Sequence, residues 1–291
     1  MKVQRLRIPA AVGAMILALG VWASPATATS VTDLPSLSAV DGFAVFGKTV
    51  NLSKATVNGD VGVSRDGRLT FMASSTVNGD LYLDSGVTIK KLDGPYGTLY
   101  EPWDLSAARD QVFAASATLA WLTPDVTYAS WTCPLTIAGN GGVNVIEITG
   151  DVDLNKESVT LTGGPNDIFV INVHGGFTLH NSGGVLAGSG MDASRILINI
   201  IGTGAKVTGK AKNEVDGTLL LPYREMEFYK VSGAIYGGDQ EIKLMSDKTI
   251  DYVPFGGPLS ADPPVPEPVT LVGFGAGLAG VACYLRKRFA R

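Results

Sequence analysis

The chain has little of the chemistry that catalytic and metal sites use. Its 291 residues include only two cysteines and two histidines, and 17% of them are charged. Neither a Gly-x-Ser-x-Gly elbow nor a Cys-x-x-Cys pair occurs. These absences favour a protein that is not an enzyme and that carries no metal centre or other cofactor.

The two cysteines are placed where they cannot pair. Cys133 lies in the middle of the chain, and Cys283 lies in an apolar segment near its end. An exported protein without a disulfide needs another source of stability. A buried stack of hydrogen-bonded strands would supply it.

Positive charge is scarce between the two ends. Three of the 23 Lys and Arg precede residue 8 and four follow residue 285, whereas all 27 Asp and Glu lie between, against 16 basic residues. Residues 8–285 therefore carry a net charge of about −11. Such a surface repels nucleic acid, and no basic patch with interleaved aromatics occurs, so we expect no nucleic-acid partner.

The first 28 residues have the pattern of a signal peptide. Lys2, Arg5 and Arg7 precede an apolar run at residues 10–22, and Ala26-Thr27-Ala28 supplies the small residues that signal peptidase accepts. We expect residues 1–28 to be removed by signal peptidase after export. A retained N-terminal anchor is the alternative.

The C-terminal end predicts a tether. Residues 253–268 form a Pro- and Gly-rich linker that ends in Pro266-Glu267-Pro268, and residues 269–285 contain no charged side chain. Seventeen helical residues reach about 25 Å, enough for a transmembrane helix. Arg286, Lys287 and Arg288 would stop transfer and keep residues 286–291 in the cytoplasm.

This tripartite end resembles the PEP-CTERM sorting signal of Gram-negative bacteria. The resemblance covers residues 265–291 and assigns Pro266, Glu267 and Pro268 to the recognition motif. It implies an exosortase-type partner in the inner membrane and delivery to the cell surface or an exopolysaccharide matrix. A permanent tail anchor is the alternative.

A repeated pentapeptide predicts the architecture of the body, residues 29–252. TVNGD occurs at residues 56–60 and again at 76–80, and short β-branched strands separated by Gly, Asn and Ser follow to residue 238. A corner that recurs every 20 residues indicates a mainly β fold, a β-solenoid, in which each coil repeats its turns. A jelly-roll or Ig-like sandwich is the alternative.

One segment, residues 104–122, predicts a long helix. It lacks Gly and Pro, Asp104 is a candidate N-cap, and Pro124 follows its end. Apolar residues recur at steps of three and four, as on one helix face: Leu105, Ala108, Val112, Ala115, Leu119 and Leu122. We expect this helix to lie along the flank of the strand stack.

The order of these elements resembles two bacterial groups, the ice-binding-like adhesins and the choice-of-anchor A surface modules. The words that carry the resemblance include Phe43-Ala44-Val45, Asp60-Val61-Gly62-Val63-Ser64 and Asp167-Ile168-Phe169, within residues 37–252. It implies a right-handed β-solenoid with a helix along it. The Thr-rich rows of ice binders are not evident, because Thr136, Thr160, Thr178 and Thr208 form no continuous T-x-T ladder.

Three side-chain groups are candidate sites. Asp60 and Asp80 would stack about 4.8 Å apart in consecutive coils, where they could hold Ca²⁺ or satisfy backbone donors at a corner. His174 and His180 are candidate metal ligands or solvent-facing strand residues. A set of aromatics could form a sugar-stacking platform or seal the helix against the coils: Tyr96, Tyr100, Trp103, Trp121, Tyr128 and Trp131.

We therefore expect an exported, surface-sorted structural or adhesive protein that displays a rigid acidic solenoid, with extracellular polysaccharide as a candidate partner. Two other classes stay open. A polysaccharide-acting β-helix enzyme would need a groove with two carboxylates about 5 to 10 Å apart. An ice- or crystal-binding protein would need a flat, regular Thr face.

Overall fold

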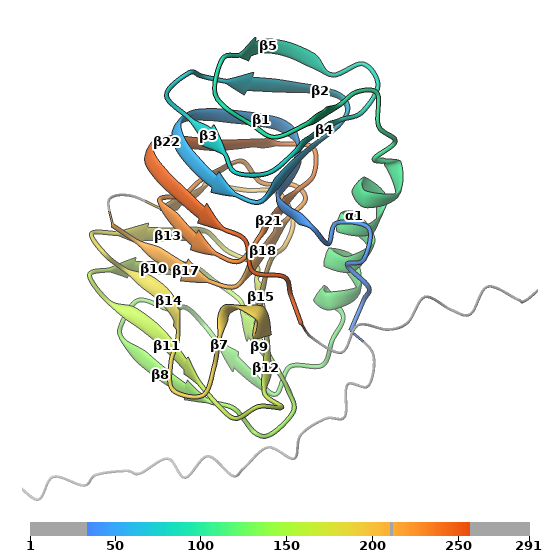
Figure 1. Cartoon of the computed structure of the whole chain (residues 1–291). Helices are drawn as coiled ribbons and strands as arrows, with labels where there is room; N and C mark the ends of the chain where they lie inside the picture. Colours follow the sequence, from blue (N-terminus) through green and yellow to red (C-terminus); the bar gives the residue numbers. More distant parts are fainter. Residues whose placement is uncertain (1–33, 210–211, 257–291) are drawn as a thin grey trace, which may run out of the picture.

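The computed structural model describes residues 34–209 and 212–256, which form a three-faced β-solenoid with one long helix along its side (Figure 1). Every strand pair in this described part is parallel, so each coil stacks on the next without a hairpin. The predicted solenoid is confirmed, and the two-layer sandwich is wrong.

Face 1 lies under the helix and has the most strands. From the top of Figure 1 to the base, its strands are β6 (Leu99–Tyr100), β4 (Leu81–Leu83), the start of β2 (Asp60–Phe71), the start of β1 (Phe43–Asn58), β21 (Ile235–Gly237), β18 (Thr218–Leu221), β15 (Ile196–Ile200), β12 (Ile168–Val173), β9 (Val143–Ile148) and β7 (Val126–Tyr128).

Faces 2 and 3 are open to solvent. Face 2 comprises β5 (Thr88–Leu92), the continuations of β2 and β1, the first half of β22 (Glu241–Asp251), β19 (Met226–Glu227), β16 (Val207–Gly209), β13 (Phe177–His180) and β10 (Val152–Asn155). Face 3 comprises β3 (Thr76–Val77), the end of β1, the second half of β22, β20 (Lys230–Ser232), β17 (Glu214–Asp216), β14 (Gly184–Ala187), β11 (Ser158–Thr162) and β8 (Leu135–Ala138).

The chain does not climb the stack in order. It begins in the middle with β1 and winds up to β6, and α1 (Ser106–Ala120) then descends along face 1 to the base (Figure 1). From β7 the coils climb again, and β22 finally pairs with β1, joining Val57 to Ile250 and Leu52 to Leu244. We call this β1–β22 contact the seam.

The TVNGD repeat makes a corner, as predicted. Thr56 and Val57 pair with Thr76 and Val77 in the next coil, and Asn78 Nδ2 donates to Asn58 Oδ1 at 2.7 Å. Gly79 is required by stacking, because a Cβ there would lie 2.4 Å from the carbonyl of Gly59. Only glycine fits at this corner, because the backbone of the neighbouring coil leaves no room for a side chain.

The helix begins later and ends earlier than residues 104–122. Leu105 occupies the N-cap without a side-chain cap, and Asp104 lies one residue earlier, where its Oδ1 accepts the Ser106 N–H at 3.0 Å. The N-cap assignment to Asp104 was therefore wrong. The predicted apolar stripe is buried against face 1, except that Leu122 is half-buried beyond the helix end.

A buried polar ladder joins the helix to face 1. Asn199 Nδ2 donates to Asn172 Oδ1 at 2.9 Å, and Ser116 Oγ donates to Asn199 Oδ1 at 2.6 Å. Asn172 Nδ2 donates to the carbonyl of Leu119 at 2.7 Å. All three polar side chains are almost fully buried and hydrogen-bonded, so the ladder fixes how the helix sits on the strands.

Candidate binding surfaces

The lower part of face 3 is an uncharged, regular array of small side chains. Strand pairing places Thr160 between Thr136 and Leu186, Thr162 beside Ala138, and Ser158 beside Gly184. Neighbours lie about 4.8 Å apart across the strands and about 6.6 Å apart along them. We call this array the threonine patch: Thr136, Ala138, Ser158, Thr160, Thr162, Gly184, Leu186 and Gly188.

The absence of a side chain at Gly188 shapes this patch. A Cβ at that position would lie 2.6 Å from Cγ2 of Thr160 and 2.8 Å from Cγ2 of Thr162. Glycine therefore leaves room for the two threonine methyl groups. The threonine patch therefore presents methyl and hydroxyl groups and contains no charged side chain.

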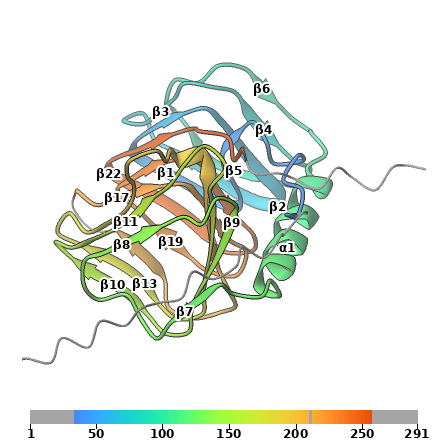
Figure 2. The same cartoon turned by 90° about the horizontal axis from the view of Figure 1, so that it is seen from below.

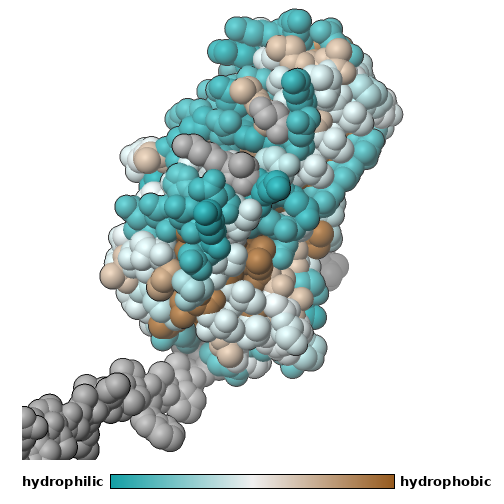
Figure 3. All heavy atoms as spheres, turned by 90° about the vertical axis from the view of Figure 1, so that its left-hand side faces the viewer, coloured by the Kyte–Doolittle hydropathy of each residue, from teal (hydrophilic) through white to brown (hydrophobic). Residues whose placement is uncertain are grey.

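Charge bounds the threonine patch on the coils above it. Glu214 and Lys230 form an ion pair. Asp216 lies on β17, the strand that pairs with β14 from the coil above Leu186. Burial raises the pKa of Asp216, and the charge of Glu214 raises it further, although the amide of Ala187 donates to its carboxylate. Figure 3 shows the same division, with hydrophilic residues over the middle and paler and brown ones toward the lower end.

Face 2 carries an ion-pair network in the place of a threonine ladder. Lys206 Nζ lies 2.9 Å from Glu225 and 2.8 Å from Glu227, and Lys248 Nζ lies 3.2 Å from Glu227. The hydrogen bond from Lys206 lowers the pKa of Glu227. Thr178 and Thr208 are paired on adjacent strands. Across the strands of face 2, Thr178 is also paired with Asp153 and Thr208 with Glu227. The structure confirms that these threonines form no continuous ladder.

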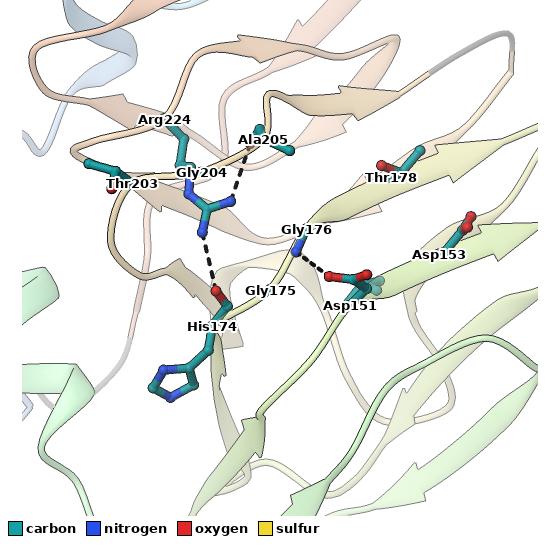
Figure 4. Close-up of a pocket in the computed structure, with 11 residues that line it drawn as sticks. Asp151, Asp153, His174, Gly175, Gly176, Thr178, Thr203, Gly204, Ala205 and Arg224 are labelled. Carbon is teal, nitrogen blue, oxygen red and sulfur yellow. Dashed lines mark hydrogen bonds between the residues drawn. The ribbon is translucent and has the colours of Figure 1, made fainter.

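A hollow of about 420 Å³ opens at the corner between faces 1 and 2 (Figure 4). Buried Arg224 forms one wall, and its guanidinium donates to four main-chain carbonyls, those of His174, Ile201, Gly202 and Ala205. Burial lowers the pKa of Arg224, an effect that Asp151 opposes. Asp151 and Asp153 line the opposite wall, so the hollow presents carboxylate acceptors, whereas the main chain takes up most of the N–H groups of Arg224.

The two histidines are each paired with a carboxylate. His174 Nε2 lies 3.0 Å from Glu147, and His180 Nε2 lies 3.4 Å from Asp153. The side chains of His174 and His180 are 40% and 31% exposed, in agreement with solvent-facing residues at the edges of strands. Among the residues that the structure describes, no group of three or more His, Cys, Asp or Glu is placed to hold a metal ion.

Asp60 and Asp80 stack in consecutive coils, as predicted. Asp60 Oδ1 accepts the amide of Asp80 at 2.8 Å, and Asp80 Oδ1 accepts the amide of Thr98 at 2.6 Å. Each carboxylate therefore satisfies a backbone donor in the coil above it. Calcium binding at this pair stays a prediction.

The aromatic residues that could have formed one platform or one seal are instead divided among separate coils. Tyr100 and Trp103 pack with Tyr82 at the top of face 1, with Tyr82 and Tyr100 stacked at 4.7 Å. Tyr96 contacts Phe71, and Tyr128 contacts Trp131 in the lowest coil. Trp121 is 88% exposed. Aromatic spacing along the chain gave no information on which coil each ring would reach.

Sequence reasoning missed two signals. Gly42 and Gly47-Lys48-Thr49 have the spacing of a phosphate-binding loop, but Gly47, Lys48 and Thr49 lie within strand β1, where Lys48 N–H donates to the Gly238 carbonyl at 3.0 Å. Such a motif needs a loop between a strand and a helix, so it carries no function here. The buried ladder also had a signal, because Ile-Asn recurs at 171–172 and 198–199.

The sorting motif Pro266, Glu267 and Pro268, the stop-transfer residues Arg286, Lys287 and Arg288, the signal peptide and the segment 269–285 lie outside the described residues. Within residues 34–209 and 212–256, no helix has the length and apolarity that a membrane crossing requires.

The parallel coils with one helix along face 1 define the class as a β-solenoid. The model of the ice-binding-like adhesive domain matches residues 17–239, and the chain belongs to this family. No curated protein matches the sequence.

Solved structures of ice-binding proteins share the fold. The protein from an Arctic yeast has a TM-score of 0.56 at 17% identity, covering 80% of this chain and 98% of its own. The ice-binding protein from an Antarctic biological consortium has a TM-score of 0.51 at 19% identity, covering 78% of this chain and 94% of its own. A domain of a Shewanella frigidimarina ice-binding protein has a TM-score of 0.52 at 19% identity, covering 75% of this chain and 97% of its own.

Proposed function

We propose that this protein is exported and binds ice through the threonine patch of face 3. The observation that carries the proposal is the uncharged, regular array around Thr160, placed on a parallel sheet. Membership of the ice-binding-like adhesive domain family and the fold of the solved ice-binding proteins support it. These relatives also support a binding role over the enzyme alternative.

The physical reason lies in the water at the surface. Ice is a neutral lattice, and a charged side chain orders its own hydration shell and resists losing it. A threonine hydroxyl can donate and accept hydrogen bonds as a lattice water does, while its methyl group adds apolar contact. The threonine patch offers both, whereas the ion pairs of face 2 oppose such contact.

Export and sorting complete the proposal. Signal peptidase would remove residues 1–28, the segment 269–285 would hold the chain in the inner membrane, and an exosortase-type enzyme would recognise Pro266-Glu267-Pro268. The protein would then reach the cell surface or the surrounding matrix. A Glu267→Ala variant that fractionates to the cell surface exactly as the wild type does would contradict this route.

Thermal hysteresis and inhibition of ice recrystallisation test the ice proposal. Thr160→Lys places a charge at the centre of the threonine patch, and we expect a loss of about tenfold or more in activity. Thr178→Lys is the matched control, because it changes the same residue type at an outward strand position of face 2. We expect that control to retain the wild-type activity.

Absence of activity in the folded wild type, or equal activity in the two variants, would overturn the assignment to face 3. Adhesion to polysaccharide is the second candidate, because the family is described as adhesive and the carboxylates of Asp151 and Asp153 in the Arg224 hollow can accept hydrogen bonds from sugar hydroxyls. Binding of the wild type to polysaccharide-coated surfaces, without ice activity, would favour adhesion.

A further inference from the structure

We propose that two copies of this chain associate base to base, through the lowest coil of the solenoid. This base coil comprises residues 123–142, with β7, Trp131 and β8. It is the lowest coil in Figure 1 and the nearest one in Figure 2, which views the molecule from below.

Four inward side chains of the base coil are incompletely covered, although Trp131 of the same coil is buried. Val126 and Tyr128 stack under Ile146 and Ile148, while Leu135 and Ile137 stack under Val159 and Leu161. The four upper residues are at most 1% exposed, whereas all four lower ones are only half-buried. The stacks of inward side chains therefore end in exposed apolar surface at the base. Solenoid proteins usually shield such an end from solvent with a capping element or a partner.

The strand edges at the base are also open. In the described part of the chain, β7 pairs with β9 alone and β8 with β11 alone, and no described element lies beneath them. Such edges present unpaired backbone donors and acceptors that can pair with another chain. A second copy related by a two-fold axis would present the same edges in the antiparallel sense.

The base has fewer charged side chains than the opposite end of the solenoid, which favours the base as the contact between two copies. Asp125 is the sole Asp, Glu, Lys or Arg of residues 123–142, and its carboxylate accepts the amide of Val145 at 2.8 Å. The opposite end is charged: residues 86–104 contain Lys90, Lys91, Asp93, Glu101 and Asp104. Residues 8–285 carry a net charge of about −11, so two copies repel elsewhere, and the base with its single charged side chain favours a symmetric dimer over a head-to-tail chain.

Sedimentation velocity on the full chain in detergent tests the proposal. Ile137→Glu puts a charge into the base coil, and Ile89→Glu is the matched control at the top end, where Ile89 is 36% exposed. We expect a wild-type dimer that Ile137→Glu weakens about 30-fold or more and that Ile89→Glu changes less than about threefold. Should Ile137→Glu lose its circular dichroism spectrum, Thr132→Glu replaces it at an exposed position of the same coil.

Three results would each overturn base-to-base pairing. A monomeric wild type would mean that the base stays uncovered or is covered by the chain's own residues 257–291. A dimer that survives the base substitution would place the contact elsewhere, such as in residues 269–285. Equal weakening by both substitutions would indicate head-to-tail stacking of the top on the base.

Discussion

The upper coils, residues 43–100, and the lower coils, residues 126–251, have the same three-faced cross-section but are held together differently. Within each set, a strand pairs with the strand one coil further along the chain, as Val61 pairs with Leu81. Between the sets, β1 pairs with β22 across about 190 residues of sequence. The local pairs follow from a repeat, whereas the seam depends on the whole chain having folded.

The seam is as well packed and hydrogen-bonded as the local pairs. Val57, Ile250, Leu52 and Leu244 are fully buried there, and Asn58 Nδ2 donates to Asp251 at 2.5 Å. Repeat proteins with local contacts alone can unfold coil by coil. The seam links the first and last strands, so we expect the two sets of coils to unfold together.

Truncation at the seam has the largest expected effect. Leu244→Ala leaves a cavity between β22 and β1 and should lower the free energy of unfolding by about 2–5 kcal/mol. Hydrogen exchange should then lose protection in both sets of coils. Leu81→Ala, also fully buried but within the upper coils, is the control. Protection lost in the lower coils alone on Leu244→Ala would show that the two sets unfold independently.

The buried ladder gives the next effect. Asn199→Ala removes the partner of both Ser116 and Asn172, and unpaired buried polar groups of this kind cost about 1–3 kcal/mol each. Denaturant unfolding measures the loss. Thr178→Ala, on open face 2, should change stability by less than about 0.5 kcal/mol. Similar losses in the two variants would mean that the ladder adds no more than an exposed contact does.

The smallest expected effect is a pH dependence that arises in the lower coils. Burial raises the pKa of Asp167, but hydrogen bonds from Gly164, Gly141 and Asn144 outweigh it and hold the pKa below its ordinary value of 3.8. The stabilisation is thus complete above that value and is lost as the pH falls through the lower, folded-state pKa.

Unfolding midpoints measured from pH 6 down to pH 2 test this dependence. Asp167→Asn cannot ionise and should lose less stability on acidification than the wild type does. Asp80→Asn is the control, since Asp80 also accepts a backbone amide but belongs to the upper coils. Parallel pH profiles for the wild type and Asp167→Asn would remove Asp167 as the source.

Much of the fold could be predicted from particular residues. The 20-residue interval of TVNGD predicted coil stacking, because a corner residue must recur where the coils are equal in length. The steps of three and four from Leu105 to Leu119 predicted the buried face of the helix. The candidate surface could not be predicted in the same way, since Thr136, Thr160 and Leu186 belong to coils of 24 and 26 residues whose register drifts.

The sequence by itself therefore determined the local features of this protein: parallel coils, a flanking helix and an acidic composition. Tertiary structure alone decided that the chain starts in the middle of its own stack, that β22 closes on β1, and that the uncharged side chains of three coils meet on face 3. Local patterns depend on neighbours within a few residues. The order of the coils depends instead on pairing between strands far apart in the sequence, such as β1 and β22, because α1 connects the top coil to the base.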